Sequence, residues 1–159
     1  AQAAAQNFPL LKFIVCGDGP AKGPMQKATE GLGNITFLPL QPFSQFNDLL
    51  NSADIHLLPQ KFAAADLVLP SKLTGMLASG RPTLACAEVG TALYEEMTGR
   101  GVCVEPENPV QFSEALISLA QSKDLRVKLG KAARERALAY WDKPAVMQTI
   151  EEELLDLCR

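Results

Sequence analysis

The sequence predicts an α/β fold in which a parallel β-sheet is flanked by helices. Apolar runs of strand length alternate with stretches of helical periodicity along the chain, a pattern typical of βαβ units. The turns after several of these runs are rich in glycine and proline, as in GDGP (17–20), PSKL (70–73) and EVGT (88–91). A length of 159 residues suits one compact domain with an ordinary core.

The apolar runs are the predicted strands, because they are short and rich in β-branched and aromatic residues. They read LKFIVC, NITFLPL, DIHLLP, RPTLACA and GVCVEP, at 11–16, 34–40, 54–59, 81–87 and 101–106. In a parallel sheet, ligands bind at the carboxyl ends of the strands, where the following helices begin. The GDGP, PSKL and EVGT corners all fall at that edge, so we predict a binding site there.

Short helices are predicted in the segments between the strands. The stretch after GDGP is polar and helix-like, and Ser44 is placed to N-cap a helix over 44–53. Ser71 is placed to cap another helix, which ends at Gly80, and TALYEEM (91–97) predicts one more.

Longer helices are predicted to complete the chain. Asn108 offers an N-cap with Pro109 at the first helical position, a favourable combination, and Asp142 is placed to cap the last helix. The apolar stripes predicted for the three helices are Phe112, Leu116 and Leu119; Leu125, Leu129, Ala132, Arg136 and Tyr140; and Val146, Ile150, Leu154 and Leu157.

Composition excludes several classes of protein. A formal net charge of −3 argues against a general nucleic-acid binder, which is usually basic. No apolar run approaches the ~20 residues of a membrane-spanning helix, and no signal peptide opens the chain. The four cysteines form no Cys-x-x-Cys and His56 is the only histidine, so we expect no metal site. We expect reduced thiols in a cytoplasmic protein.

The beginning of the chain has no initiator methionine and reads AQAAAQNFP, like the last turns of a helix. We therefore expect residues 1–159 to form a single domain of a longer protein, and the sheet to lack its first strand.

Lys72 raises the sharpest functional question. It occupies the first turn of a predicted helix, where a cation is unfavourable by a few tenths to ~1 kcal/mol unless an anion joins it. Free amides, the Ser71 hydroxyl and the Lys72 ammonium together would make a phosphate site. The alternative is a capped helix whose lysine extends into solvent.

The other glycine corners carry weaker signals. GDGP spaces its glycines as G-x-G-x-x-x-G and no acidic residue ends the following strand, so an NAD site is improbable. Gly90 would let backbone approach a ligand and Thr91 could donate a hydroxyl, although an ordinary βα turn explains both. The basic run over 123–136 is most simply a solvated helix face, with contact to a membrane surface as the minority interpretation. His56 is interpreted as a packed strand residue.

The order of these segments resembles a known family. FIVCGDGP, NITFLPL, NSADIHLLPQ, LPSKLTGMLASGRPTLA, EVGTALYE and GVCVEPENP follow one another as in the C-terminal domain of family-4 retaining glycosyltransferases. These enzymes have the GT-B fold of two Rossmann-like halves, and the C-terminal half holds the nucleotide-sugar donor. The Pro-Ser-Lys-Leu variant looks like the subgroup that builds bacterial exopolysaccharide and O-antigen, including colanic acid.

The resemblance implies roles for individual positions. Gly17, Asp18 and Gly19 would end a strand beside the donor. The base would lie near Phe37, Leu38 and Pro39. Pro70, Ser71, Lys72 and Leu73 would line the diphosphate and ribose, with Lys72 as the catalytic cation. The donor's sugar or phosphate would lie near Gly90 and Thr91.

The chain departs from the family pattern at the glutamate pair. Gly75 stands where the family has the ribose-binding glutamate, and Leu67, beside Asp66, stands at the other position. Ribose contacts must therefore differ from the usual ones, or donor binding is weaker.

The function implied is transfer of a sugar from a nucleoside-diphosphate sugar to a glycan or lipid-linked acceptor, with retention and without a metal or other cofactor. The partners implied are the donor and an N-terminal acceptor-binding domain, with peripheral contact at the inner membrane surface. The fragment alone is expected to transfer nothing. The alternatives are a GT-B nucleotide-sugar epimerase or hydrolase, and a non-enzymatic α/β module.

Overall fold

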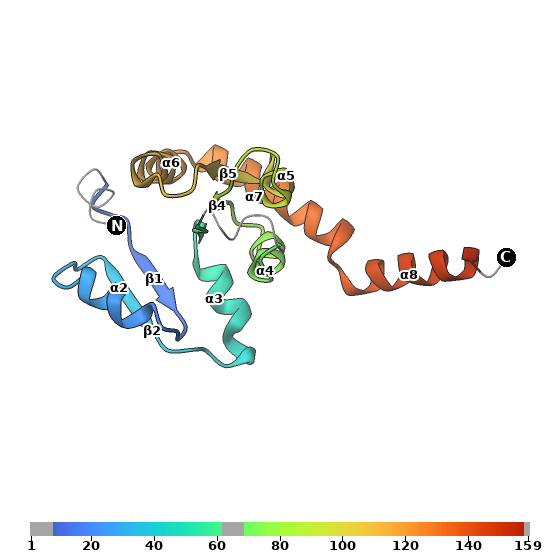
Figure 1. The fold of residues 1–159 in the computed structure, drawn as a ribbon, viewed down its shortest axis with the longest axis horizontal. Coiled ribbons are helices and arrows are strands. Elements are labelled where there is room, and N and C mark those ends of the chain that lie inside the picture. Colours follow the sequence, from blue (N-terminus) through green and yellow to red (C-terminus); the bar gives the residue numbers. More distant parts are fainter. Residues whose placement is uncertain (1–7, 62–68, 158–159) are drawn as a thin grey trace.

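The computed structural model describes residues 8–61 and 69–157, and it confirms the predicted parallel α/β architecture (Figure 1). The strands are β1 (Phe13–Cys16), β2 (Ile35–Leu38), β3 (His56–Leu58), β4 (Thr83–Cys86) and β5 (Gly101–Val104). All of the strand pairs are parallel, as predicted. The strands form two separate sheets, β1–β2 and β3–β4–β5, rather than one. Within the described residues, β2 is the only strand paired with β1, so the other edge of β1 is unpaired there.

Helices connect the strands and complete the chain. They are α2 (Lys22–Ala28), α3 (Phe46–Ser52) after the 3-10 turn η1 (Phe43–Gln45), α4 (Lys72–Ala78), α5 (Ala92–Met97), α6 (Pro109–Gln121), α7 (Lys123–Tyr140) and α8 (Lys143–Leu157). No helix in the described parts of the chain combines the length and the apolar character that crossing a membrane requires.

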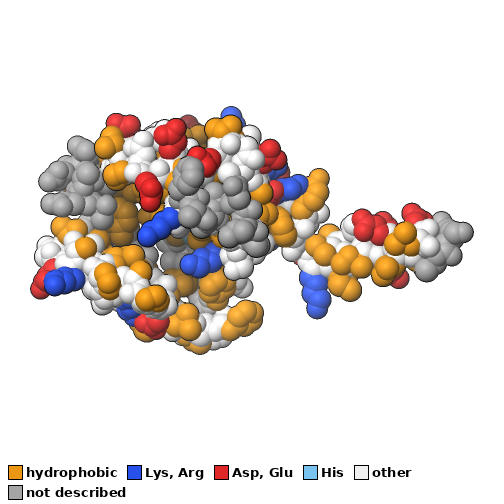
Figure 2. All heavy atoms as spheres, viewed as in Figure 1, with side chains coloured by type: hydrophobic (Ala, Val, Ile, Leu, Met, Phe, Trp, Pro, Cys, Tyr) orange, Lys and Arg blue, Asp and Glu red, His pale blue; other side chains and the backbone are white. Residues whose placement is uncertain are grey.

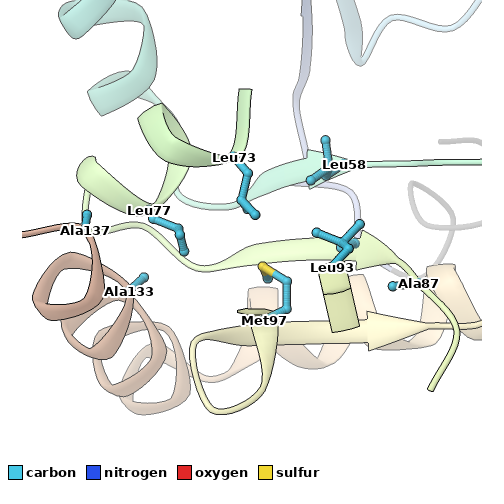
Figure 3. Close-up of a cluster of buried hydrophobic side chains, with 9 residues drawn as sticks. Leu58, Leu73, Leu77, Ala87, Leu93, Met97, Ala133 and Ala137 are labelled. Carbon is cyan, nitrogen blue, oxygen red and sulfur yellow. The ribbon is translucent and has the colours of Figure 1, made fainter. Parts of the chain in front are cut away.

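The core lies on both faces of the three-stranded sheet. Because successive strand residues point to opposite faces, Ala85 and Leu84 of β4 belong to different clusters. On one face, Leu73 and Leu77 of α4 pack with residues of α5 and α7 (Figure 3). The list of buried residues in this cluster is Leu58, Leu73, Leu77, Ala85, Ala87, Leu93, Met97, Ala133 and Ala137. Leu116 and Leu119 of α6 cover the other face, as their predicted stripe requires.

The first residues of the helices show which of the predicted N-caps are correct. Asn108 caps α6 as predicted, since its side chain accepts a hydrogen bond from the Gln111 amide at 3.0 Å. Ser44 lies inside η1 and does not cap α3, which begins at Phe46. Ser71 precedes α4 but makes no side-chain cap. Its backbone is already helical, with φ −56° and ψ −24°, whereas a capping residue needs a non-helical conformation to turn its side chain onto the first amides.

The buried face of α7 matches the predicted stripe at Leu129, which is buried, and at Leu125, which packs against the core, but it differs from the stripe further along the helix. Ala133 and Ala137 are buried, whereas Ala132 is only half-buried and Tyr140 is exposed. The reason is close helix packing: α7 lies against the end of α4, where only small residues fit at the contact.

The last helix, α8, has no buried residue. Its predicted apolar stripe exists but faces solvent, with Leu154 57% exposed. In Figures 1 and 2, α8 projects from the rest of the molecule, and hydrophobic side chains run along it. The sequence stripe therefore predicted the helix correctly, and the helix lies away from the sheet.

Candidate donor site at the carboxyl edge of the strands

The PSKL corner leads from β3 into α4. Leu73 is 2% exposed and anchors the first turn of the helix in the core, while Ser71 and Lys72 remain exposed. The Ser71 carbonyl accepts a hydrogen bond from the Thr74 hydroxyl at 3.1 Å, so the backbone of this turn is held while the Ser71 hydroxyl is not used as a cap. Among the residues that the structure describes, Lys72 makes no ion pair. The corner therefore presents the Lys72 ammonium, which has no ion-pair partner among the described residues, beside the Ser71 hydroxyl, which does not cap the helix.

The GDGP corner follows β1, and more of its polar groups already have partners within the protein. Gly17 has φ +125°, a conformation that side chains rarely adopt, and its amide donates to the Leu38 carbonyl at 3.3 Å. The Asp18 carboxylate pairs with Lys22 at 2.5 Å. The hydrogen bond from Lys22 and its charge lower the pKa of Asp18. Gly19 has open space around its Cα, so the loop leaves room for a ligand on that side.

Phe37, Leu38 and Pro39 lie at the end of β2, next to GDGP in the two-stranded sheet. Of their carbonyl groups, Leu38 already accepts from Gly17. The Pro39 carbonyl accepts from the Cys16 thiol at 3.2 Å and from the Gln41 amide at 2.9 Å. A base reading this edge through backbone groups would have to share or replace these bonds.

The EVGT turn follows β4 and begins α5. Gly90 has φ +88° and no atom within 4 Å of an added Cβ, so backbone is accessible there. The Thr91 hydroxyl donates to the Glu88 carbonyl at 2.8 Å and accepts from the Tyr94 amide at 3.3 Å. In this structure, Thr91 is therefore the N-cap of α5, and its hydroxyl proton is used in a hydrogen bond within the EVGT turn.

The predicted site residues form two groups. PSKL and EVGT lie at the carboxyl edge of the three-stranded sheet, whereas GDGP and Phe37–Pro39 lie at the same kind of edge of the two-stranded sheet. At Gly75, where the resemblance implied a ribose-binding glutamate, an added Cβ would meet Leu50 of α3 at 3.3 Å and Phe46 at 3.7 Å. Asp66 and Leu67 lie outside the described residues.

His56 is a packed strand residue, as interpreted from the sequence. It is 7% exposed, and its Nε2 lies 3.0 Å from the Ser79 hydroxyl. Burial, and to a smaller extent the charge of Arg81, lower the pKa of His56. The described residues contain no group of three or more His, Cys, Asp or Glu side chains arranged to hold a metal ion.

The basic run on α7 is not simply a solvated face. Arg126 donates to the carbonyls of Leu119 and Ala120, each at 2.7 Å, and Arg134 donates to the Ala78 carbonyl at 2.5 Å. These guanidinium groups cap the ends of α6 and α4, as cations near helix C-termini do. The remaining lysines of the run, Lys123, Lys128 and Lys131, are exposed.

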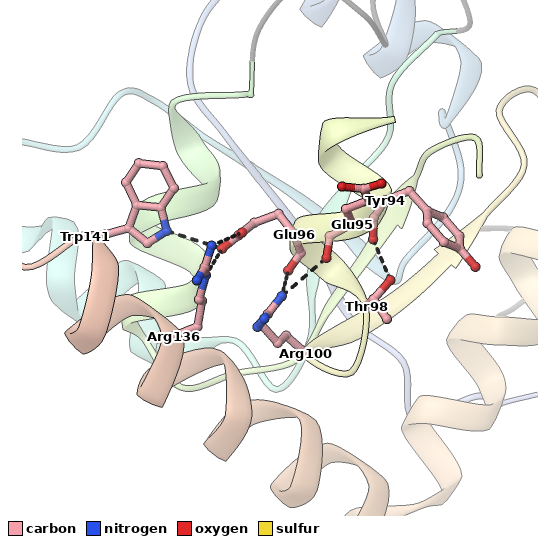
Figure 4. Close-up of polar contacts among 7 residues, drawn as sticks. All are labelled: Tyr94, Glu95, Glu96, Thr98, Arg100, Arg136 and Trp141. Carbon is pink, nitrogen blue, oxygen red and sulfur yellow. Dashed lines mark hydrogen bonds and ion pairs between the residues drawn. The ribbon is translucent and has the colours of Figure 1, made fainter. Parts of the chain in front are cut away.

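The feature that sequence reasoning missed is a buried carboxylate. Glu96 of α5 is 7% exposed and accepts two hydrogen bonds from Arg136, each 2.8 Å long (Figure 4). Trp141 donates to the same carboxylate at 3.3 Å. A signal was present: Glu96 falls on the helix face of Leu93 and Met97, which are both buried, and a lone charge on such a face needs a partner.

Comparison with known proteins assigns the family. Residues 1–136 match the family described as glycosyl transferases group 1. The chain belongs to the group 1 glycosyl transferases. It is 40% identical over 148 residues to the putative colanic acid biosynthesis glycosyl transferase WcaI of Escherichia coli, covering 90% of this chain and 35% of that protein. It is also 28% identical to the D-inositol 3-phosphate glycosyltransferase of Corynebacterium glutamicum, over 82% of this chain and 32% of that protein.

Several solved structures share the fold of this group 1 domain. Sucrose-phosphate synthase from Thermosynechococcus elongatus superimposes with a TM-score of 0.78 at 16% identity, over 98% of this chain and 40% of that one. HepE from Anabaena, solved with UDP-glucose, superimposes with a TM-score of 0.77 at 17% identity, over 98% of this chain and 43% of that one. These similarities confirm the predicted Rossmann-like fold, and the family match and the 40% identity confirm the family resemblance. The chain spans about a third of the length of the curated relatives it matches.

Proposed function

We propose that this chain is the donor-binding domain of a glycosyltransferase that moves a sugar from a nucleoside-diphosphate sugar to a glycan or lipid-linked acceptor in bacterial surface polysaccharide synthesis. The observation that carries the proposal is the family match over residues 1–136. The 40% identity to a protein named for colanic acid biosynthesis supports the polysaccharide class. UDP-glucose in the HepE structure supports a nucleotide-sugar donor.

The chemistry proposed is transfer with retention of anomeric configuration and without a metal ion. Negative charge grows on the leaving diphosphate as the glycosidic bond breaks, and preorganised donors stabilise it. Lys72 supplies the cation, because its ammonium has no ion-pair partner among the described residues. Ser71 adds a hydroxyl that its own helix does not use, and Gly90 leaves backbone accessible for the sugar or phosphate.

The proposal includes an N-terminal acceptor-binding domain, without which this chain transfers nothing. It is supported by the share of the relatives that the chain spans, 35% and 32%. We place the reaction in the cytoplasm. Peripheral contact with the inner membrane surface is supported by the exposed lysines Lys123, Lys128 and Lys131 of α7, since such cations attract anionic lipids.

The test uses the complete protein that carries this domain. It is incubated with UDP-, GDP- and ADP-sugars and membrane extract, and the product anomer is identified by NMR. Formation of a glycoside with the donor's configuration is expected. Consumption of the donor without an acceptor would instead indicate an epimerase or hydrolase. Absence of nucleotide binding by calorimetry would indicate a non-enzymatic module.

A further inference from the structure

The junction between α7 and α8 is fastened to α5 by one polar cluster. Its centre is the Glu96 carboxylate, which receives both hydrogen bonds of the Arg136 fork and the indole N–H of Trp141. Trp141 is the residue that ends α7, so it lies at the point where the chain turns into α8. Arg136 also lies over the Tyr140 ring, 3.5 Å from its centroid. Figure 4 shows the Arg136 and Trp141 side chains converging on Glu96.

This cluster fixes the end of α7, from which the chain continues into α8. No residue of α8 is buried, and α7 is the main element that α8 contacts. The direction of α8 therefore depends on its junction with α7, where Tyr140 and Trp141 belong to the cluster. A paired, desolvated carboxylate with fixed donors permits few alternative arrangements, since any shift leaves charge unpaired.

The same short helix, α5, extends to the candidate donor edge. It contains only six residues, Ala92–Met97, so Glu96 lies just over one turn from its N-cap Thr91. Leu93 and Met97 are 2% and 0% exposed, and Arg100 donates to the Glu96 carbonyl at the other end at 2.6 Å. The short helix α5 therefore connects Glu96 directly to the Gly90–Thr91 turn.

We propose that Glu96 is a positioning residue that couples the placement of the α7–α8 junction to the Gly90–Thr91 turn at the donor edge. The inference rests on the proposed function, because it assumes that the donor occupies that edge. Coupling between sites is reciprocal. Donor binding should therefore change the surroundings of Trp141, and disturbing Glu96 should weaken donor binding.

The test measures UDP binding to the complete protein in two ways. Trp141 is the only tryptophan in this chain. Its signal is isolated by subtracting the fluorescence of a Trp141→Phe variant at the same UDP occupancy, which calorimetry fixes for each protein. Titration with UDP should change that signal with the same midpoint that calorimetry gives for UDP binding. If calorimetry shows binding while the Trp141 signal stays constant, the coupling is refuted and the proposed function stands. If neither UDP, GDP nor ADP binds, both fail together.

A pair of variants separates positioning from mere stability. Glu96→Gln removes the charge at the centre of the cluster, whereas Glu95→Gln makes the same change on the next residue of α5, whose side chain is exposed. Below the melting temperature of both, Glu96→Gln should weaken UDP binding about fivefold or more, the low end of usual site coupling, and abolish the Trp141 response. Glu95→Gln should leave both unchanged.

A second variant protects the test against loss of folding. Trp141→Phe keeps an aromatic ring, although a smaller one, and removes the indole N–H donor to Glu96, so it should fold. It should weaken UDP binding in the same direction as Glu96→Gln, by a smaller factor. If both variants lower the melting temperature but bind UDP like Glu95→Gln, the cluster is purely structural and the proposal is overturned.

Discussion

Gly130 of α7 lies directly against the carbonyl oxygen of Gly80, so that a Cβ added to Gly130 would overlap this oxygen. Gly80 itself has φ +69° and lies in the turn that directly follows α4. Arg134, one helical turn beyond Gly130, donates to the Ala78 carbonyl beside this contact. The absence of a side chain at Gly130 thus allows α7 to approach the end of α4 closely enough for that hydrogen bond.

The first prediction is that Gly130→Ala destabilises the fold. The added methyl group meets backbone that cannot move without shifting α4, and overpacking of this kind costs about 1–3 kcal/mol. The measurement is the free energy of unfolding in urea. Gly23→Ala is the matched control, since Gly23 lies in α2 with no atom within 4 Å of an added Cβ. It should be neutral or stabilising by up to about 1 kcal/mol. Equal effects at the two positions would contradict the close contact.

Two buried threonines should respond in opposite ways to the same substitution. The Thr83 hydroxyl is fully buried and has no hydrogen-bond partner among the described residues. Thr83→Val should therefore stabilise the fold by about 1 kcal/mol or more, because an unsatisfied polar group is replaced by an apolar one of the same shape. Thr91→Val removes the cap of α5 and should cost about 0.5–2 kcal/mol. Thermal unfolding of both variants checks the signs, and destabilisation by Thr83→Val would contradict this account.

Stability should fall at mildly acidic pH because of His56. The Ser79 hydroxyl donates to the Met76 carbonyl at 2.6 Å, so we infer that His56 Nε2 donates to Ser79. Burial lowers the pKa of His56 in the folded state, whereas the unfolded chain titrates near ~6.5. As pH falls below ~6.5, the unfolded state binds a proton first. The free energy of unfolding then falls by up to ~1.4 kcal/mol per pH unit, until the pH reaches the lowered pKa of His56 in the folded state.

The measurement for His56 is the free energy of unfolding at several values between pH 7.5 and 5. His56→Gln keeps an N–H donor near the position of Nε2 and cannot titrate, so its stability should depend less on pH in this window. Parallel curves for the two proteins would show that His56 does not account for the dependence.

The last prediction concerns catalysis by Lys72 in the complete protein. If Lys72 stabilises charge that grows on the leaving diphosphate, Lys72→Ala should lower kcat on the order of 10²-fold with less effect on donor affinity. Lys72→Arg should restore activity only in part, since the planar guanidinium has a different reach. Lys27→Ala, a change of an exposed lysine on α2, is the control. Turnover of Lys72→Ala within about twofold of wild type would identify Lys72 as a solvated surface residue.

Much of the secondary structure was predictable because its signals are local. Apolar runs of strand length identified the strands, and Asn108-Pro109 marked the beginning of α6. The PSKL corner after β3 followed from proline and the start of a helical pattern, and its resemblance to a family rested on the order of such segments. The division into two sheets was not predicted, since the pairing of strands depends on contacts between residues distant in sequence.

The sequence by itself thus determined the alternation of strands and helices and the family, whereas the tertiary structure divided the candidate binding corners between two sheets. Only the tertiary structure decided which face of α7 is buried, because that depends on how closely Gly130 can approach Gly80. It also decided that Thr91 caps α5 whereas Ser71 does not cap α4, since packing sets the backbone conformation at the start of each helix. The partner of Glu96 lies 40 residues away at Arg136. No local pattern specifies such a pair, because it forms only when burial has removed the carboxylate from water.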